Sequence, residues 1–342
     1  MARAKRRSNA HEKMRELIGA YWTSQLLRVA VELGVADVLA KGPRSAEAIA
    51  QQVGAQPAQL RRVLRALASQ GIFAEDAKGR FRLTGLAQTL RSDRPGSLRD
   101  FARMMIDDYN WQAWSALLHG VTTGALPFDH VHGVPLFEYL AQHPEKERRF
   151  AASMASVSGV QNEAVARAYP FGKLRQLVDV GGAHGHLLAT ILRRHKKLRG
   201  VLYDQTQVVA AAAKSGFLSA PELAGRCEAR GGTFWDSVPA GADGYLMKYI
   251  LHDWTDEQCL RILGHCRDAM AEDGRVLVVD HVVPKGNGAD WSKLRDINML
   301  VLPGGQERTR EEFRELFARA GLRLARVVPT ACPLFVLEAV RA

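Results

Sequence analysis

The chain has 342 residues, 47% of them hydrophobic and 24% charged, a composition typical of a folded protein with room for two domains. The longest apolar runs fall short of eighteen residues and no apolar segment follows the basic first residues, so we expect neither a membrane-spanning helix nor a secretory signal, and a cytoplasmic protein. The four cysteines lack CxxC spacing, which favours reduced thiols over disulfides or a zinc site.

The net charge of +11 is concentrated near the N-terminus. Residues 1–100 contain 18 Lys and Arg against 9 Asp and Glu, whereas residues 101–342 contain 29 against 27. Such a surplus can attract nucleic acid. It also fits a solvated basic tail at residues 3–7 with further arginines on exposed helix faces, and we favour this second interpretation.

The first predicted helix is long and apolar and covers residues 21–40. Two helices follow it: one at 45–54, which begins at the N-cap Ser45 and ends at a glycine, and one at 56–71, with an apolar face and a glycine after it. Residues 72–84 read as two short strands around a turn. Two helices and a hairpin are typical of a winged helix.

A winged helix allows two kinds of function. Arg61, Arg62 and Arg65 on its second helix keep open a DNA-binding regulator that senses a small molecule. The apolar helix at 21–40 looks instead like a surface that another chain covers. We therefore expect a homodimer formed through this domain, and neither a nucleic acid nor a membrane as partner.

Residues 96–170 form a second helical stretch, rich in Met and aromatic residues. We expect helical segments at 97–124 and 134–160, joined by a turn-rich loop at 125–133. His130 and His132 in this loop have a spacing that a metal could use, but no carboxylate or cysteine cluster accompanies them, so we expect no metal site.

After residue 170, short apolar runs alternate with helical patterns. The runs lie at residues 176–180, 200–204, 243–248, 275–283, 322–328 and 334–340. This alternation predicts a doubly wound α/β fold, with a mostly parallel sheet covered on both faces and the last two runs paired antiparallel. The predicted domains are a winged-helix dimerisation domain at 1–95, a helical linker at 96–172 and an α/β domain at 173–342.

The first apolar run contains Asp179 and turns into a helix through Gly181, Gly182 and Gly185. Ligands of such sheets bind beyond the carboxyl ends of the strands, and glycines let the backbone approach them closely. Asp204, at the end of the next run, suits the hydroxyls of a ribose. The pattern predicts a nucleotide cofactor and leaves open NAD and S-adenosylmethionine (SAM), which share that ribose.

The sequence resembles the small-molecule O-methyltransferases typified by plant caffeic acid and bacterial antibiotic-pathway enzymes. It does so in six ordered motifs: "DVGGAHG", "LYD", "RGGTFWDSVP", "ADGYLMKYILHDWTDEQCLRIL", "VLVVDHVVP" and "GGQERT". The resemblance covers nearly the whole chain, because that family also begins with a winged-helix dimerisation domain. It implies a Rossmann-like class I methyltransferase fold with a seven-stranded sheet, SAM as cofactor, S-adenosylhomocysteine as product, no metal, and a small hydroxylated aromatic substrate.

The resemblance also implies roles for individual residues. Asp179 and Gly181 match positions at the methionine end of SAM, and Ser158 matches one near the cofactor carboxylate. The full set of implied cofactor residues is Ser158, Asp179, Gly181, Gly182, Asp204, Gln205, Thr233, Phe234 and Lys248. His252 falls on the family's general base, and Asp280 and Glu307 fall on its acidic partners.

The chemistry of methyl transfer to a phenol supports those roles. A phenol has a pKa of about 10, so its oxygen is a poor nucleophile at neutral pH until a base removes the proton. A histidine can do so, and a neighbouring carboxylate fixes its tautomer and stabilises the imidazolium. Outside the family context, His252 could instead be a structural histidine in a turn with Asp253 as a helix N-cap, and Asp280 and Glu307 could be surface acids.

The acceptor is expected to be a flat, apolar molecule such as a polyketide or phenazine. The candidate substrate contacts are Met105, Trp111, Phe150, Met154, Asp253, Asn298, Met299 and Leu302. A second hypothesis keeps SAM binding but assigns other chemistry, such as hydroxylation or decarboxylation. The presence of His252, Asp280 and Glu307 together argues against it.

Three features depart from the family pattern. Ala183 stands where glycine is usual, so we expect its backbone to avoid positive φ or to shift slightly. Thr233 replaces an acid before Phe234, and Gln205 with Thr206 replaces Leu-Pro. These departures bear on the affinity for SAM rather than on its identity.

Overall fold

The structure, a computed structural model, describes residues 9–214 and 220–342 and divides the chain into two compact units. Unit 1 comprises Met1–Trp111 and Leu140–Val157, and unit 2 comprises Gln112–Tyr139 and Ser158–Ala342. The predicted linker at 96–172 is thus shared between the units, and the basic tail at 3–7 lies outside the described residues. None of the described helices combines the length and the hydropathy that a membrane span needs.

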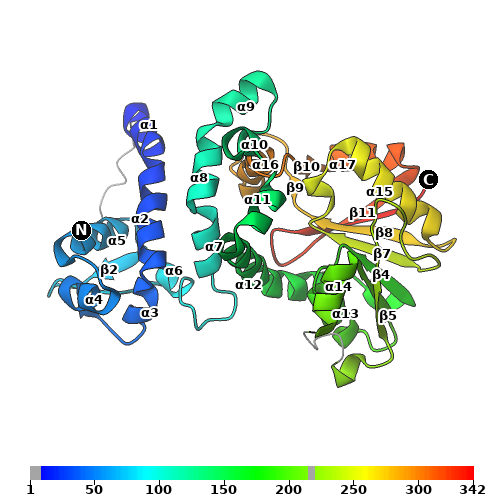
Figure 1. Ribbon diagram of the computed structural model, residues 1–342, viewed down its shortest axis with the longest axis horizontal. Helices are drawn as coiled ribbons and strands as arrows, with labels where there is room; N and C mark the ends of the chain where they lie inside the picture. The colour runs from blue at the N-terminus through cyan, green and yellow to red at the C-terminus, as the bar shows by residue number, and fades with distance from the viewer. Residues whose placement is uncertain (1–8, 215–219) are drawn as a thin grey trace. The chain divides into compact units, whose positions relative to one another are not determined.

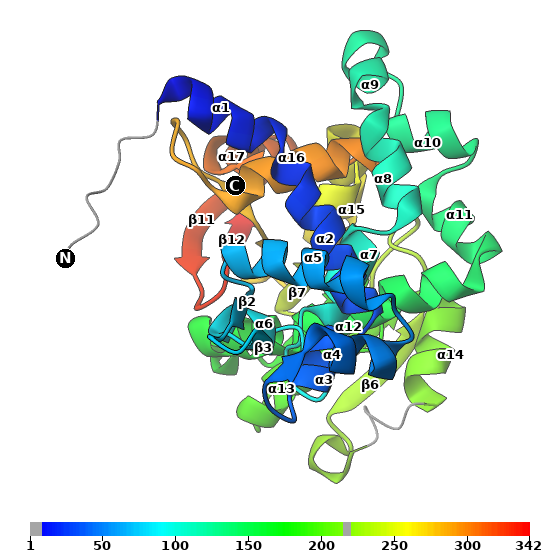
Figure 2. The same ribbon diagram turned by 90° about the vertical axis from the view of Figure 1, so that its left-hand side faces the viewer.

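Unit 1 is a helical domain with a small antiparallel sheet (Figure 2). Its helices are α1 (Ala10–Ile18), α2 (Ala20–Glu32), α3 (Val35–Leu39), α4 (Ala46–Val53), α5 (Pro57–Ser69), α6 (Gly85–Gln88) and α7 (Arg99–Met105), and its strands are β1 (Arg44–Ser45), β2 (Phe73–Glu75) and β3 (Arg80–Leu83). Leu64 and Leu67 of α5 pack with Phe73 and Phe81 of the β2–β3 hairpin in a fully buried core. The predicted helix–helix–hairpin order is confirmed.

Local sequence signals account for most boundaries in this unit. The Ser45 hydroxyl accepts the Ala48 N–H at 3.3 Å, and Gly54 with φ +70° ends α4. The prediction of one helix over 21–40 is wrong. Gly34 adopts φ +65°, a left-handed conformation that interrupts the helical hydrogen bonds and separates α2 from α3.

Further helices follow along the chain. They are α8 (Asp108–Ser115), α9 (Leu117–Thr123), α10 (Pro127–His132), α11 (Leu136–Gln142) and α12 (Pro144–Ala168). The predicted loop at 125–133 contains α10, because Pro127 suits a first helical turn and Gly133 with φ +76° ends the helix. His130 and His132 therefore lie on a helix, and the His130 ring stacks on that of His119 with centroids 3.7 Å apart.

The large sheet of unit 2 has seven strands in the order β11-β12-β8-β7-β4-β5-β6. These are β4 (Gln176–Val180), β5 (Arg199–Asp204), β6 (Cys227–Gly231), β7 (Gly244–Lys248), β8 (Arg275–Asp280), β11 (Leu322–Pro329) and β12 (Phe335–Arg341). The five strands from β6 to β8 run parallel, while β12 is antiparallel to both β8 and β11, so the sheet is mixed. The predicted antiparallel pair at the C-terminus is confirmed.

Helices cover both faces of this sheet (Figure 1). The remaining elements are α13 (His186–Arg194), α14 (Thr206–Lys214), α15 (Asp256–Ala269), α16 (Trp291–Val301), α17 (Arg310–Arg319), the short 3-10 turns η1 (Phe171–Lys173), η2 (Pro221–Leu223) and η3 (Leu251–Asp253), and a pair of strands, β9 (Val282–Val283) and β10 (Arg308–Thr309). One face packs Leu202 and Leu246 against Leu188 of α13, and the other packs Tyr245 against Phe317 of α17. All four cysteines are free thiols, as their spacing predicts.

Because β4, β5, β7 and β8 are parallel, their carboxyl ends meet at one edge of the sheet. The residues that follow these strands are therefore neighbours in space although they are far apart in sequence. This edge carries the candidate site.

Candidate active site and cofactor pocket

The turn after β4 is packed closely against neighbouring side chains. A Cβ added to Gly181, whose φ is +69°, would lie 2.5 Å from Cδ1 of Ile250, and one added to Gly182 would lie 2.6 Å from Oδ2 of Asp179. Side chains at these two positions would collide with the walls of the turn. Both positions of the turn therefore require glycine.

Ala183, in the same turn, adopts φ +50°, so the expectation that its backbone avoids the left-handed region is wrong. Its N–H donates to Oδ2 of Asp204 at 2.8 Å, a bond that holds the residue in this costly conformation. The other oxygen of Asp204 accepts the Gln205 N–H at 2.7 Å. The end of β5 is thus fixed to the glycine turn.

Phe234 borders the turn on another side, since a Cβ at Gly181 would lie 3.6 Å from its ring. The Phe234 ring meets that of Trp235 edge-on, with centroids 5.0 Å apart. The Thr233 hydroxyl accepts the Trp235 N–H at 3.3 Å and so stabilises the local turn. Gly181, Asp204 and Phe234 therefore come together at one edge of the sheet.

Asp179 and Lys248 are two charged groups buried behind this turn. Burial raises the pKa of Asp179 to about 7, although the positive charge of Lys248 offsets part of the rise. Burial likewise lowers the pKa of Lys248 to about 8 against the effect of Asp179. Within the described part of the chain, Oδ2 of Asp179 has no hydrogen-bond partner. A buried carboxylate oxygen without a partner suits a donor from a bound ligand.

One face of α12 adds polar groups to the same region. Lys248 donates to Oδ1 of Asn162 at 2.8 Å and lies 3.5 Å from the Ser158 hydroxyl. Gln161 donates to the Tyr249 hydroxyl at 2.9 Å. Gln161, Asn162 and Tyr249 were not predicted from the sequence. The helical spacing of 158, 161 and 162 was the available signal, because three polar residues on one face of a helix rich in apolar residues need a partner.

His252 lies in η3, just beyond β7, and is 5% exposed. Its Nδ1 is 3.3 Å from Oδ1 of Asp280 and 3.2 Å from Oε1 of Glu307. Its Nε2 is 3.4 Å from Oδ1 of Asp253. Three acids that were candidate site residues at separate places in the sequence thus lie around one imidazole in the structure.

The surroundings of His252 favour its charged form. Burial by itself lowers the pKa of the imidazole, but the carboxylates of Asp280, Glu307 and Asp253 outweigh it and raise the pKa to about 10. Burial pushes the pKa of Asp280 upward, and the adjacent His252 more than reverses this, so that the net direction is downward. At neutral pH the imidazole is therefore mostly protonated, and it can accept a proton only in its neutral form.

A glycine loop joins His252 to Glu307 through the backbone. A Cβ on Gly305 would lie 1.8 Å from the carbonyl oxygen of His252, so that position has no room for a side chain. The N–H of Gln306 donates to this same oxygen at 2.9 Å. The loop that carries Glu307 is therefore fixed directly to the turn that carries the imidazole.

Asp253 is not the helix N-cap that the structural interpretation of this turn assumed. Thr255 caps α15 instead, and it forms a capping box with Gln258. The buried Arg308 donates to the carbonyl oxygens of Leu251 and Trp254 at 2.9 and 3.1 Å, which stabilises the turn. The Asp253 carboxylate is thus left facing Nε2 of the imidazole.

Arg295 on α16 is a further residue that was not predicted from the sequence. Its Nε donates to Oε1 of Glu307 at 2.6 Å, and its guanidinium lies 5.0 Å from the centroid of the Tyr249 ring. That ring stacks on the imidazole of His252, with centroids 5.1 Å apart and 21° between the planes. Asp296 completes the arrangement by accepting the Glu307 N–H at 2.9 Å. An arginine within a helix carries no motif that would single it out.

The imidazole and its two acids also have the close spacing that metal sites show, with ligand atoms within 4.8 Å of one another. The guanidinium of Arg295 already occupies Oε1 of Glu307, however, and the raised pKa of His252 favours a proton on the imidazole. The groups present therefore suit proton transfer better than a metal ion.

The candidate substrate residues fall in both units. In unit 2, Oδ1 of Asn298 accepts the indole N–H of Trp114 at 3.2 Å, and Met299 and Leu302 are buried near the end of α16. The other four candidates, Met105, Trp111, Phe150 and Met154, belong to unit 1. Contact of these residues with a substrate stays a prediction.

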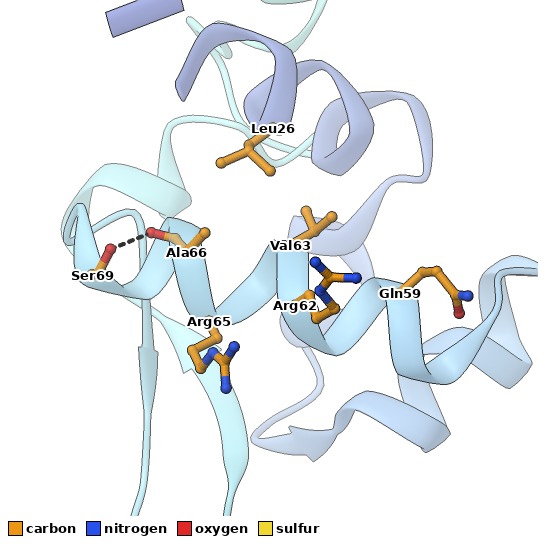
Figure 3. A pocket seen from close by; sticks show the side chains of 7 residues that line it. All are labelled: Leu26, Gln59, Arg62, Val63, Arg65, Ala66 and Ser69. Carbon is orange, nitrogen blue, oxygen red and sulfur yellow. Dashed lines mark hydrogen bonds between the residues drawn. The ribbon is translucent and has the colours of Figure 1, made fainter. Parts of the chain in front are cut away.

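Unit 1 carries a separate pocket of about 630 Å³ between α2 and α5. Figure 3 shows Leu26 of α2 facing Val63 and Ala66 of α5. The pocket is lined by Leu26, Gln59, Arg62, Val63, Arg65, Ala66 and Ser69. Its lining is apolar and cationic, without the carboxylates and imidazole that surround His252.

Comparison with known proteins gives matches along most of the chain. Residues 15–93 match the O-methyltransferase dimerisation domain, and residues 114–323 match the O-methyltransferase domain. The phenazine O-methyltransferase PhzM of Lysobacter antibioticus is 42% identical over 324 residues, which cover 95% of this chain and 94% of that protein. An 8-amino-8-demethylriboflavin N,N-dimethyltransferase of Streptomyces davaonensis is 34% identical over 317 residues, which cover 92% and 90% of the two chains.

Among solved structures, CalO1, a methyltransferase in calicheamicin biosynthesis, superposes with a TM-score of 0.89 at 38% identity. The superposition covers 100% of each chain, and that crystal structure is of the form bound to S-adenosylhomocysteine (SAH). The two units described above therefore have counterparts in a protein solved with a product of SAM.

Proposed function

Because the chain belongs to the family of SAM-dependent O-methyltransferases, we propose that it methylates a hydroxyl oxygen of a small aromatic secondary metabolite, with His252 as general base. The observation that carries this proposal is the pair of carboxylates, from Asp280 and Glu307, at Nδ1 of the buried imidazole. They hold the ring so that Nε2 takes up the proton of the acceptor. Bound SAM supplies an electrophilic methyl group on its sulfonium, so no metal is needed.

The residues of the glycine turn fit SAM. The unpartnered Oδ2 of Asp179 suits a cationic amino group, whose charge would favour the ionised carboxylate. The carboxylate of Asp204 suits ribose hydroxyls, and Lys248 with Ser158 suits a carboxylate. We assign the adenine side of the pocket to Gln205, Thr233 and Phe234, and the backbone at Gly181 and Gly182 to the methionine side.

The raised pKa of His252 favours proton transfer from a phenol. The carboxylates around the imidazole raise its pKa to about 10, which makes its neutral form a stronger base than an ordinary histidine. The carboxylates of Asp280 and Glu307 then stabilise the imidazolium. Base catalysis of this kind contributes roughly 10²- to 10⁴-fold to the rate. Asp253, on the Nε2 side, is placed to contact the acceptor.

Methylation of nitrogen is the second candidate, since one relative is an N,N-dimethyltransferase. A neutral amine already has a free lone pair and needs no base before it attacks, whereas a hydroxyl does. Three acids around a buried imidazole are therefore better matched to a hydroxyl acceptor. The three acids around His252 also disfavour the alternative in which the protein binds SAM but catalyses hydroxylation or decarboxylation, because they suit the deprotonation of a hydroxyl acceptor.

We propose a second copy of the chain as the protein partner. Leu17, Ile18, Tyr21 and Trp22 of α1 and α2 are between 52% and 68% exposed, and they lie within the match to the dimerisation domain. Clustered exposed apolar side chains indicate a surface that is covered in the assembled protein. Such a dimer would use the helical surface of unit 1 for assembly rather than for DNA.

The proposed function is tested with methyl-labelled SAM and matched pairs of polycyclic aromatic acceptors that carry a hydroxyl or an amine at the same position. We expect mass gain and label on oxygen for the hydroxyl compounds. Label on nitrogen alone would contradict the proposal. Tight SAM binding with turnover of an acceptor to a product that carries no label would point instead to the non-methyl chemistry.

A further inference from the structure

Arg295 shares one carboxylate oxygen with His252. Its Nε donates to Oε1 of Glu307 at 2.6 Å, and Nδ1 of His252 lies 3.2 Å from that same atom. We propose that Arg295 is a positioning residue, which draws the charge of Glu307 away from the imidazole and so keeps His252 able to accept a proton. This inference rests on the proposed role of His252 as general base.

A second contact fixes the guanidinium in place. Arg295 lies over the Tyr249 ring at 5.0 Å, and the His252 imidazole stacks on that ring at 5.1 Å. Lys248 Nζ and the His281 ring also lie near the Tyr249 ring, at 5.3 and 6.0 Å. Gln161 in turn binds the Tyr249 hydroxyl at 2.9 Å. The guanidinium and the imidazole thus both contact the phenol ring, and both contact Oε1 of Glu307.

The groups around His252 come from five elements. They are Asp253 in η3, Asp280 and His281 at the end of β8, Glu307 before β10, Tyr249 after β7 and Arg295 on α16. Three carboxylates therefore face the imidazole and one guanidinium opposes them. Burial lowers the pKa of His281, and Arg295 adds to the effect, so His281 brings no second cation at neutral pH.

The charge balance decides whether the base is available. Three acids without an opposing cation would hold the proton on His252 still more firmly, and an imidazolium cannot take a proton from the acceptor. The pKa of Arg295 is raised: burial opposes the charge, but Glu307, Tyr249 and Asp280 outweigh it. Its positive charge is thus present at every pH at which the protein is folded, which suits a fixed counterweight to the acids.

The test compares Arg295→Met and Arg295→Lys with a matched control on the same helix. Lys293→Met removes a positive charge two residues away, where Nζ binds the carbonyl oxygen of Gly288 at 2.8 Å on the surface. For each protein, the pH dependence of methyl transfer is measured at saturating SAM. In parallel, the protonation of His252 is followed by NMR on histidine-labelled protein without SAM or acceptor, assigned with His252→Gln.

We expect Arg295→Met to shift the acid limb of the rate profile upward by about one pH unit or more, which is roughly a tenfold loss at pH 7 that alkaline pH restores. The NMR titration of His252 should move in the same direction. Arg295→Lys should recover most of the shift because it keeps the charge. Lys293→Met should leave both measurements unchanged.

A uniform loss of rate at every pH, with an unmoved His252 titration, would overturn the inference and leave Arg295 a merely structural residue. The inference also fails if Lys and Met behave alike at position 295. Failure of the underlying function looks different. In that case His252→Gln would retain its rate and the wild-type profile would show no acid limb, whatever happens at Arg295.

Discussion

The Nδ1 atom of His252 lies 3.3 Å from Oδ1 of Asp280, the last residue of β8. The register of the parallel pair explains this contact, because Lys248 at the end of β7 pairs with Val279, the residue before Asp280. The proposed base and its acidic partner therefore lie at the ends of two neighbouring strands of the central sheet. A rigid sheet edge is a good support for groups that must stay aligned through a reaction.

Removal of the imidazole should abolish most of the activity. We expect His252→Ala to lower kcat at least about a hundredfold, because the acceptor then loses its base, while SAM affinity changes little. His281→Gln is the matched control, since its ring lies 6.0 Å from that of Tyr249 in the same region. Steady-state kinetics and calorimetry with SAM give both quantities. Equal losses for the two variants would mean that His252 has no special role.

The activity should depend on pH through the same group. His252 acts only when neutral, and because its acid neighbours raise its pKa to about 10, the acid limb of the rate profile should lie well above the ordinary histidine value of about 6.5. Turnover should therefore rise at least about tenfold between pH 6 and pH 8. A profile already flat above pH 6.5 would show that the neighbouring carboxylates do not act on the base.

Ala183→Gly should relieve backbone strain in the glycine turn. An L-residue with φ near +50° costs about 1–2 kcal/mol, and glycine removes this cost while adding about 0.4–1 kcal/mol of unfolded-state entropy. We expect a gain in stability of up to about 1 kcal/mol in denaturant unfolding, with SAM binding at least as tight. Ala189→Gly, inside α13, should instead lose about 1 kcal/mol. Equal losses at both positions would contradict the strain.

Asp179→Asn should separate stability from cofactor binding. Burial raises the pKa of Asp179 to about 7 from 3.8, so its contribution to stability is complete below about pH 4 and is lost as the pH rises through 7. The neutral variant avoids that loss, and its Tm should exceed the wild-type value more at pH 8 than at pH 5. SAM affinity should fall at least about tenfold in calorimetry, because a charge-assisted hydrogen bond is removed.

Asp243→Asn provides the control for Asp179→Asn. This residue precedes β7 at the opposite edge of the sheet, and its carboxylate accepts the N–H groups of Arg175 and Gln176, both at 2.7 Å. The variant should lose some stability and keep its SAM affinity. If SAM binds both variants equally well, Asp179 is not part of the cofactor pocket.

Trp22→Glu should disrupt the proposed dimer. Trp22 is 63% exposed on α2, and a charge there would have to be buried if a second copy covers this surface. Light scattering should report a monomer at concentrations where the wild type is a dimer. Leu118→Glu, at a 75% exposed position outside the matched dimerisation domain, should keep the wild-type mass. A dimer that persists with Trp22→Glu would place the interface elsewhere.

The sequence is most informative where one short pattern determines one element. Runs such as 176–180 are buried along nearly their whole length and were recognisable as central strands. In contrast, β6 was missed because four of its five residues are exposed, so no apolar run marks this edge strand. The helix α10 was missed because its six residues are too few for a visible periodicity.

The candidate site divides in the same way. Asp204 and Asp280 end parallel strands and His252 closely follows one, so their adjacency at the sheet edge could be expected from the strand pattern alone. Arg295 and Gln161 reach the site from α16 and α12, and their proximity to the base depends on how these helices pack. Side-chain packing of that kind leaves no local signal at Arg295, and at Gln161 the available signal was its place on a polar face of α12, so the contacts of both residues emerged only from the structure.

Gly305 has a consequence for how the family can vary its acceptors. The main chain of the Glu307 loop binds the carbonyl oxygen of His252 directly. His252 and Glu307 therefore do not need an acceptor to bring them together. Side chains elsewhere in the proposed acceptor site can then vary while Glu307 stays beside the imidazole. Such a backbone arrangement would let acceptor specificity change during evolution while the proposed proton transfer is retained.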